Sequence, residues 1–149
     1  MEIGGLDEMI NEKDQAQDNV VSFEDQKPKR RPFHYWKVGD REYKLKLTTR
    51  TIEQVENKYR KNIQNLVTDD GIPPLSVMLT VIQAAMITWE HSISYQKIQD
   101  LYDKWTEDGG SQTGFYAQIL MPTLAVSGFF TERQAASMLE SVENMDSLT

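Results

Sequence analysis

The chain has 149 residues, of which 39% are hydrophobic and 26% charged, and its formal net charge is -7. This length suits one soluble domain with a core of its own. The absence of cysteine excludes thiol catalysis, disulfide bonds and cysteine-ligated zinc, and the two histidines, His34 and His91, stand apart without a ligand pattern. The composition therefore points to no metal and no cofactor.

Charge divides the sequence into three blocks. Residues 1–26 hold eight acidic and one basic side chain, residues 27–61 hold four acidic and twelve basic, and residues 62–149 hold eleven acidic and three basic. The first block has too few branched and aromatic residues to offset its chain entropy by burial. We therefore expect an acidic flexible leader and a basic, proline-containing linker over residues 1–32, and a folded domain over residues 33–149.

A β-hairpin is predicted where this domain begins. Polar and apolar residues alternate on both sides of Gly39-Asp40, which is typical of strands joined by a two-residue turn. One face of the hairpin becomes aromatic and aliphatic, and it needs a cover because an isolated hairpin is only marginally stable in water. The predicted cross-strand pairs are Trp36 with Tyr43, His34 with Leu45, and Lys37 with Glu42.

Four or five helices are predicted to supply that cover. Their apolar residues recur at spacings of three and four, and capping residues or prolines mark their starts. The fold class that follows is mainly α, an N-terminal β-hairpin followed by a bundle of four to five helices. The predicted helices span residues 49–66 with a break near Lys61-Asn62, 75–89 after two prolines, 95–105 after Ser92 or Ser94, 115–126 with a kink at Pro122, and a short one after the capping box at 131–134.

The helix at residues 75–89 is the most apolar segment. It lies in an uncharged run of nineteen residues, Gly71 to Trp89, whose prolines and polar residues favour a buried helix over a membrane span. Burial in the core explains most of this helix. The competing interpretation is that its own domain covers one side and a partner or a second copy covers the other, with the methionines as adaptable contacts.

The basic residues at 27–46 leave three interpretations open. They can be an ordinary solvated strand edge, where lysines discourage edge pairing, or an attraction for the acidic leader. They also lie beside Phe33 and Tyr35, a mixture that proteins binding single-stranded nucleic acid use. Because the predicted register buries Trp36 and Tyr43, we favour the solvated edge and keep a small nucleic-acid-binding module as the alternative function.

Paired carboxylates occur at Asp69-Asp70 and at Glu107-Asp108. Both pairs precede glycine in predicted turns, where aspartate and glycine occur for backbone reasons. A solvated turn is the favoured interpretation over an acid and base pair. We therefore expect no catalytic residues and no enzyme activity.

The order of the elements resembles the small tail assembly chaperones of long-tailed bacteriophages. The resemblance covers about residues 35–131. It is carried by the strand at residues 43–49, the helix from Ile52 to Ile63, the proline-started helix from Leu75, and the run from Trp105 through the acidic Gly109-Gly110 turn to residues 127–130. The long acidic leader is not part of the family pattern.

This resemblance implies a non-enzymatic chaperone. Such a protein keeps the tape measure protein soluble in the host cell cytoplasm while tail tube protein subunits polymerise around it, and it is absent from the mature virion. Self-association and a longer form made by ribosomal frameshifting are further expectations, whereas a membrane partner is not. The expected partner contacts are apolar: Val77, Met78, Val81, Met86, Phe129 and Phe130.

Overall fold

The computed structural model describes residues 31–69 and 71–148, with only the backbone of residues 142–148. Residues 1–30, which hold most of the predicted leader and linker, lie outside the described residues. The described chain starts with strands β1 (His34–Val38) and β2 (Arg41–Leu45), paired as one antiparallel hairpin. Gly39 has a φ of +64° in the turn, a conformation that glycine adopts without steric cost.

The predicted register of the hairpin is confirmed. Trp36 pairs with Tyr43, His34 with Leu45, and Lys37 with Glu42. The buried face consists of Trp36, Val38, Tyr43 and Leu45.

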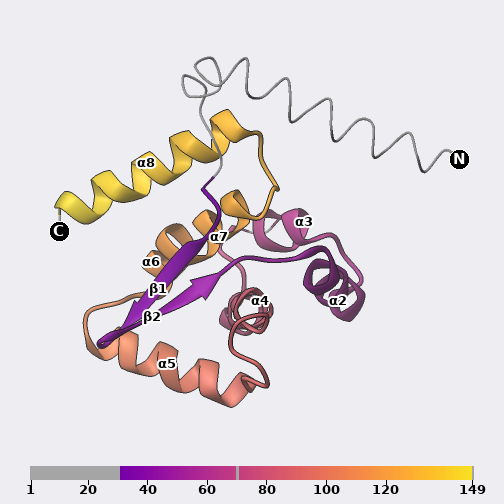
Figure 1. Cartoon of the computed structure of the whole chain (residues 1–149), viewed down its shortest axis with the longest axis horizontal. Coiled ribbons are helices and arrows are strands. Elements are labelled where there is room, and N and C mark those ends of the chain that lie inside the picture. The colour runs from indigo at the N-terminus through magenta and orange to yellow at the C-terminus, as the bar shows by residue number, and fades with distance from the viewer. Residues whose placement is uncertain (1–30, 70, 149) are drawn as a thin grey trace, which may run out of the picture.

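Helices make up the rest of the fold, which confirms the predicted class, mainly α with a leading hairpin. Figure 1 shows α4 almost end-on near the centre of the molecule, where it contacts β2, α2, α5 and η1. The helices are α2 (Thr49–Tyr59), α3 (Ile63–Thr68), α4 (Leu75–Met86), α5 (Tyr95–Glu107), α6 (Gln112–Gly114), the π-helix η1 (Phe115–Leu120), α7 (Met121–Val126) and α8 (Glu132–Leu148).

The break predicted near Lys61-Asn62 separates α2 from α3. Thr48 caps α2 and forms a capping box with Thr51. Arg60 then takes the left-handed conformation, with a φ of +57°, which ends α2. The Asn62 side chain accepts a hydrogen bond from the Asn65 amide at 2.8 Å and starts α3.

Helix α4 is shorter than predicted. It starts directly after Pro74 but ends at Met86, so Trp89 lies in the turn that follows and not on the helix. There the rings of Trp89 and Phe33 form a T-shaped contact, with 5.3 Å between the ring centroids. The spacing of apolar residues had placed Trp89 on the helix, but its side chain instead packs against the start of the hairpin.

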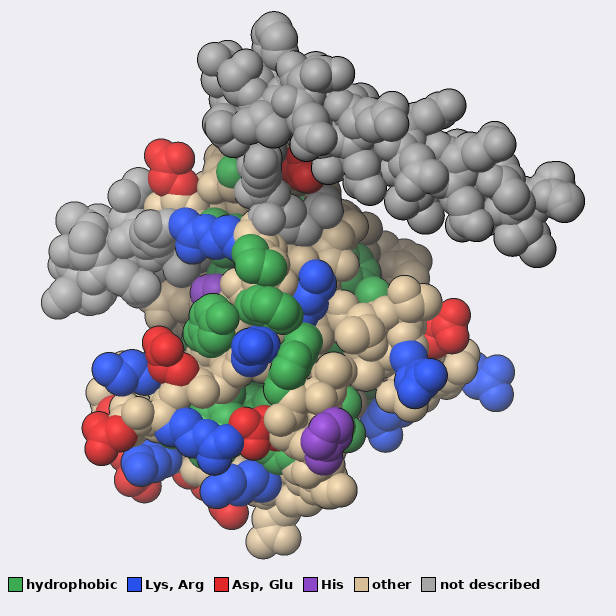
Figure 2. All heavy atoms as spheres, viewed as in Figure 1, with side chains coloured by type: hydrophobic (Ala, Val, Ile, Leu, Met, Phe, Trp, Pro, Cys, Tyr) green, Lys and Arg blue, Asp and Glu red, His purple; other side chains and the backbone are tan. Residues whose placement is uncertain are grey.

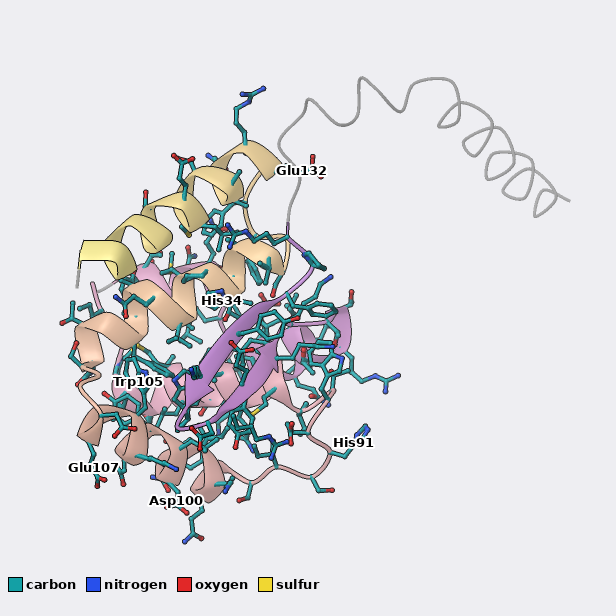
Figure 3. All side chains as sticks on the ribbon, turned by 60° about the vertical axis from the view of Figure 1, so that its left-hand side comes forward. His34, His91, Asp100, Trp105, Glu107 and Glu132 are labelled. Atoms are coloured by element: carbon teal, nitrogen blue, oxygen red, sulfur yellow. The ribbon has the colours of Figure 1, made fainter. Side chains whose placement is uncertain are left out.

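The predicted kink at Pro122 corresponds to a change of helix type. The segment passes from the π-helix η1 into α7, with Pro122 near the start of α7. Proline has no N–H to donate to the Gln118 carbonyl four residues earlier. The His34 Nε2 atom lies 2.8 Å from that carbonyl oxygen, so Nε2 carries the proton and donates it (Figure 3).

Two backbone groups after β2 fasten the hairpin to the helices. The Lys46 amide donates to the Ala85 carbonyl of α4 at 3.0 Å, and the Leu47 amide donates to Ser127 Oγ after α7 at 2.8 Å. The last helix, α8, packs on α7 and runs for 17 residues, so the prediction of a short helix there is wrong.

Candidate partner-binding site

The most apolar helix, α4, has a fully covered side. The hairpin, α5 and η1 pack around it, and the exposed fraction is 8% at Val77 and 0% at Met78, Val81 and Met86. These four predicted contacts are therefore core residues of the monomer, which corrects the expectation that they form a surface. The hairpin and the helices after α4 converge on the same side of it, so one domain suffices to enclose them.

The other side of α4 is partly open to solvent. Ser76 is exposed, and Thr80, Gln83, Ala84 and Ile87 are half-buried, at spacings of four, three, one and three residues. These spacings place the five residues on one stripe of the helix. Helix α2 covers this stripe only in part, and the stripe consists of other residues than the predicted contacts Val77, Met78, Val81 and Met86.

Three hollows line up along this open stripe, which we call together the α4 groove. The central hollow, of about 210 Å³, lies between α2 and α4 and is lined by Gln54, Val55, Lys58 and the stripe residues from Thr80 to Ile87. Gln54 and Ile87 also line a hollow of about 640 Å³ that extends to His91. Lys58, Thr80 and Gln83 also line one of about 570 Å³ that extends to Ser76 and Tyr95. The shared residues make the three hollows neighbours along α4.

The polar side chains on the floor of the groove already have partners in the chain. Thr80 Oγ1 donates to the Ser76 carbonyl at 2.7 Å, and Gln83 Nε2 donates to the Ile93 carbonyl at 3.1 Å. Ala84 and Ile87, which are half-buried, add apolar side chains to the lining of the central hollow. The floor can therefore meet an apolar surface with little loss of hydrogen bonding.

Phe129 and Phe130, the other two predicted contacts, lie in the turn between α7 and α8. Both are half-buried and pack against the core, and the Phe129 amide donates to the Leu124 carbonyl at 3.3 Å. The structure does not bring them to the α4 groove as lining residues. Their rings contribute to the packing of this turn.

Chemically reactive groups are sparse in the described region. Burial, with a smaller effect from the neighbouring Asp103 carboxylate, raises the pKa of the Tyr102 phenol, so this group stays protonated at neutral pH. No three His, Asp or Glu side chains among those described, in residues 31–69 and 71–141, group as metal ligands. In residues 31–69 and 71–148, no helix has both the length and the apolar character that crossing a bilayer requires.

Asp69 and Asp108 lie in turns, whereas Glu107 is the last residue of α5, and Asp70 lies outside the described residues. Asp69 caps the C-terminus of α3 and forms an ion pair with Lys61 at 2.8 Å. Glu107 and Asp108 are exposed at the end of α5, where Asp108 is the C-cap residue. Figure 3 shows Glu107 and Asp100 pointing outward from α5, whereas Trp105 of the same helix points inward.

The sequence held a signal for the α4 groove. Small or polar residues recur at Ser76, Thr80 and Ala84 on an otherwise apolar helix, which marks the side that does not need burial. Counting only apolar residues highlighted the enclosed side, because that side is where the large residues concentrate.

The sequence model of one protein family matches the chain. It is described as a family of unknown function, DUF6096, and the match spans residues 31–148, which include every helix and strand described above. No curated protein and no solved structure gives a significant match.

Proposed function

Because the chain belongs to the DUF6096 family, whose function is unknown, we propose from its own sequence and surfaces that it is a tail assembly chaperone of a long-tailed bacteriophage. In this proposal it binds the tape measure protein in the host cell cytoplasm and keeps it soluble. Tail tube protein subunits then take over the tape measure protein, and the chaperone leaves before the virion is complete. The resemblance in element order supports this proposal, and the α4 groove is the observation on which it depends.

The groove fits a helical client. Helix α4 has 12 residues and is therefore about 18 Å long, which corresponds to about three turns of a helix lying beside it. A helix that docks in a groove presents apolar side chains at every third and fourth position. Ala84 and the Thr80 methyl group allow such side chains to approach closely, while Gln54 and Lys58 border the contact with polar groups.

The shape of the groove also fits temporary binding. Its hollows are shallow and open, so a docked helix would bury only a small area of this chain. Interfaces that bury less than about 1,200 Å² in total are typical of weak and transient complexes. Such a contact masks an apolar client segment and still releases it when tube subunits compete for the same segment.

Coexpression with the tape measure protein tests the proposal. Ala84→Glu places a carboxylate on the floor of the groove, where a docked helix would deprive it of water. We expect the variant to bind the tape measure protein about tenfold more weakly, which corresponds to about 1.4 kcal/mol of binding free energy, and the soluble fraction of the tape measure protein to fall. The fraction is measured by centrifugation and quantitative blotting.

Ser137→Glu is the matched control, because it adds the same charge at an exposed position of α8. Circular dichroism must show the same helix content and melting temperature for both variants, so that a loss of solubility reports on binding. If the Ala84→Glu variant keeps the tape measure protein as soluble as the unsubstituted chain does, the groove is not the client site. If the unsubstituted chain gives no soluble tape measure protein, the chaperone proposal itself fails.

A further inference from the structure

A second surface lies on the hairpin, on the side that faces away from the core. We call its aromatic and basic part the outer hairpin face, which consists of Phe33, Tyr35, Lys44, Lys46 and Trp89. The cross-strand pair Lys37 and Glu42 lies on the same side, nearer the turn. Tyr35 and Lys44 are cross-strand partners, and Tyr35 is 47% exposed. Figure 2 shows hydrophobic side chains gathered in the middle of the molecule, where Figure 1 places the hairpin, with basic side chains among them.

Two lysines on this face have aromatic rings as partners. Lys44 Nζ lies 4.5 Å from the centroid of the Phe33 ring and 5.7 Å from a ring centroid of Trp89, and Lys46 Nζ lies 5.6 Å from the Phe33 centroid. Within the described residues, neither ammonium group has a carboxylate within 4 Å. Arg41 differs from them, because its guanidinium forms a 2.6 Å ion pair with Glu90. The face therefore presents two cations that no described anion neutralises.

The described chain begins next to this face, because Phe33 is its third residue. Residues 1–26 carry eight acidic side chains and one basic, and Phe33 of the face follows the linker directly. Phe33 comes ten positions after Phe23. Ten extended residue steps reach up to about 34 Å, twice the length of about 17 Å that a five-residue strand spans. A segment tethered so closely has an effective concentration on the order of millimolar at the face.

We propose that residues 1–26 bind the outer hairpin face of their own chain. The acidic side chains of the leader meet Lys44 and Lys46, and the apolar residues beside them, Val20, Val21 and Phe23, contact the aromatic rings. A chain with a net charge of -7 repels free nucleic acid at long range, whereas it holds its own leader by the tether. This inference is independent of the α4 groove and of the client proposed for it.

Paramagnetic relaxation in the full chain tests this contact. The chain has no cysteine, so Ser22→Cys provides one site for a nitroxide label. We expect the label to broaden the amide signals of Tyr35 and Lys44 and the indole signal of Trp89 at low salt, and to leave Ser137 of α8 unchanged. The broadening should fall by more than half in about 0.5 M salt, because screening then acts within a few ångströms.

Charge reversal identifies the partner groups. Lys44→Glu together with Lys46→Glu should remove the broadening. Lys97→Glu together with Arg133→Glu changes the net charge equally at exposed positions of α5 and α8 and should leave it intact. Should the first double variant fail to fold, neutralising the leader with Asp18→Asn, Glu24→Gln and Asp25→Asn must remove the broadening instead.

Three outcomes overturn the proposal. One is an absence of broadening at low salt, or broadening that survives both sets of charge changes. Another is broadening transferred from labelled chains to isotope-labelled, unmodified ones in a mixture, which would assign the contact to a second copy. The third outcome concerns a single-stranded oligothymidylate. If it shifts the Tyr35 and Trp89 signals of the unsubstituted chain as strongly as those of the chain with the neutralised leader, the face binds nucleic acid.

Discussion

The aromatic rings of Trp36, Trp105 and Phe115 pack together, and this packing requires a glycine at position 110. A Cβ atom on Gly110 would lie 2.4 Å from two carbons of the Trp105 ring, closer than any real contact. The ring has little freedom to move away, because its centroid lies 5.6 Å from that of Phe115 and 6.2 Å from that of Trp36. Gly110 is thus fixed by steric packing, without the positive φ that Gly109 has.

Replacing this glycine tests the packing directly. At a position whose backbone conformation suits alanine, replacing glycine by alanine usually stabilises a protein by about 0.4–1 kcal/mol, because alanine restricts the unfolded chain. For Gly110→Ala we expect the opposite sign, a loss of about 1–3 kcal/mol, because the new methyl group overpacks the ring. Urea unfolding followed by circular dichroism measures the change in the free energy of unfolding.

A double-mutant cycle identifies the ring as the cause. In a Trp105→Leu background, Gly110→Ala should cost less than about 0.5 kcal/mol, since the obstructing atoms are gone. An equal cost in both backgrounds would mean that the backbone at Gly110, and not the indole ring, sets the requirement.

At the scale of secondary-structure elements, the residues that start and stop helices were predictable because their chemistry is local. Thr48, Asn62 and Ser94 each cap a helix by accepting a hydrogen bond from a residue three positions later. The hairpin register followed in the same way from the position of its turn. A few neighbouring residues determine the helix caps and the hairpin register, so both can be predicted from a short stretch of sequence.

Two features that were not predicted depend on distant contacts. The Gln118 carbonyl in η1 receives a hydrogen bond from His34, which is 84 positions away in the sequence. Trp89 leaves the period of α4 to pack on Phe33. Neither partner can be identified from a window of neighbouring residues, because both choices depend on which elements meet in the folded domain.

Helix α8 offers a test of local capping at this scale. Thr131 Oγ1 accepts from the Gln134 amide at 3.1 Å, and the Thr131 amide donates to Gln134 Oε1 at 3.0 Å, which is the predicted capping box. Of the side chains described in α8, only Ala135 and Leu139 are buried. The helix therefore has few tertiary contacts to compensate for a lost cap.

We expect Thr131→Ala to destabilise α8 by about 1 kcal/mol. Hydrogen exchange should accelerate in the first turns of α8 and stay unchanged in α4. Thr131→Ser keeps the hydroxyl group and should retain protection. Equal protection in the alanine and serine variants would show that packing on α7, and not the cap, holds the start of this helix.

At the scale of the whole molecule, the sequence identified the helix that carries the candidate site but not the side of it. The spacing of apolar residues along α4 shows what fraction of the helix surface is apolar enough to be buried, and that fraction is large. Which stripe stays open depends on where the hairpin, α2 and α5 come to lie around the helix, and the period does not contain that arrangement. The open stripe is consequently the one with the smallest and most polar residues, Ser76, Thr80 and Ala84 among them.

Substitutions on the two sides of α4 should therefore affect different properties, stability on the enclosed side and client binding on the open stripe. Val81→Ala removes two buried methyl groups and should lower the free energy of unfolding by about 2 kcal/mol, while the molecules that remain folded still solubilise the tape measure protein. Ala84→Glu should leave the unfolding curve unchanged and reduce that activity. Thermal unfolding and the coexpression assay, applied to both variants, measure the two properties separately. If Val81→Ala abolished client binding at a temperature where the chain is folded, Val81 would contact the client after an opening of the domain, and the enclosed side of α4 would be the binding surface after all.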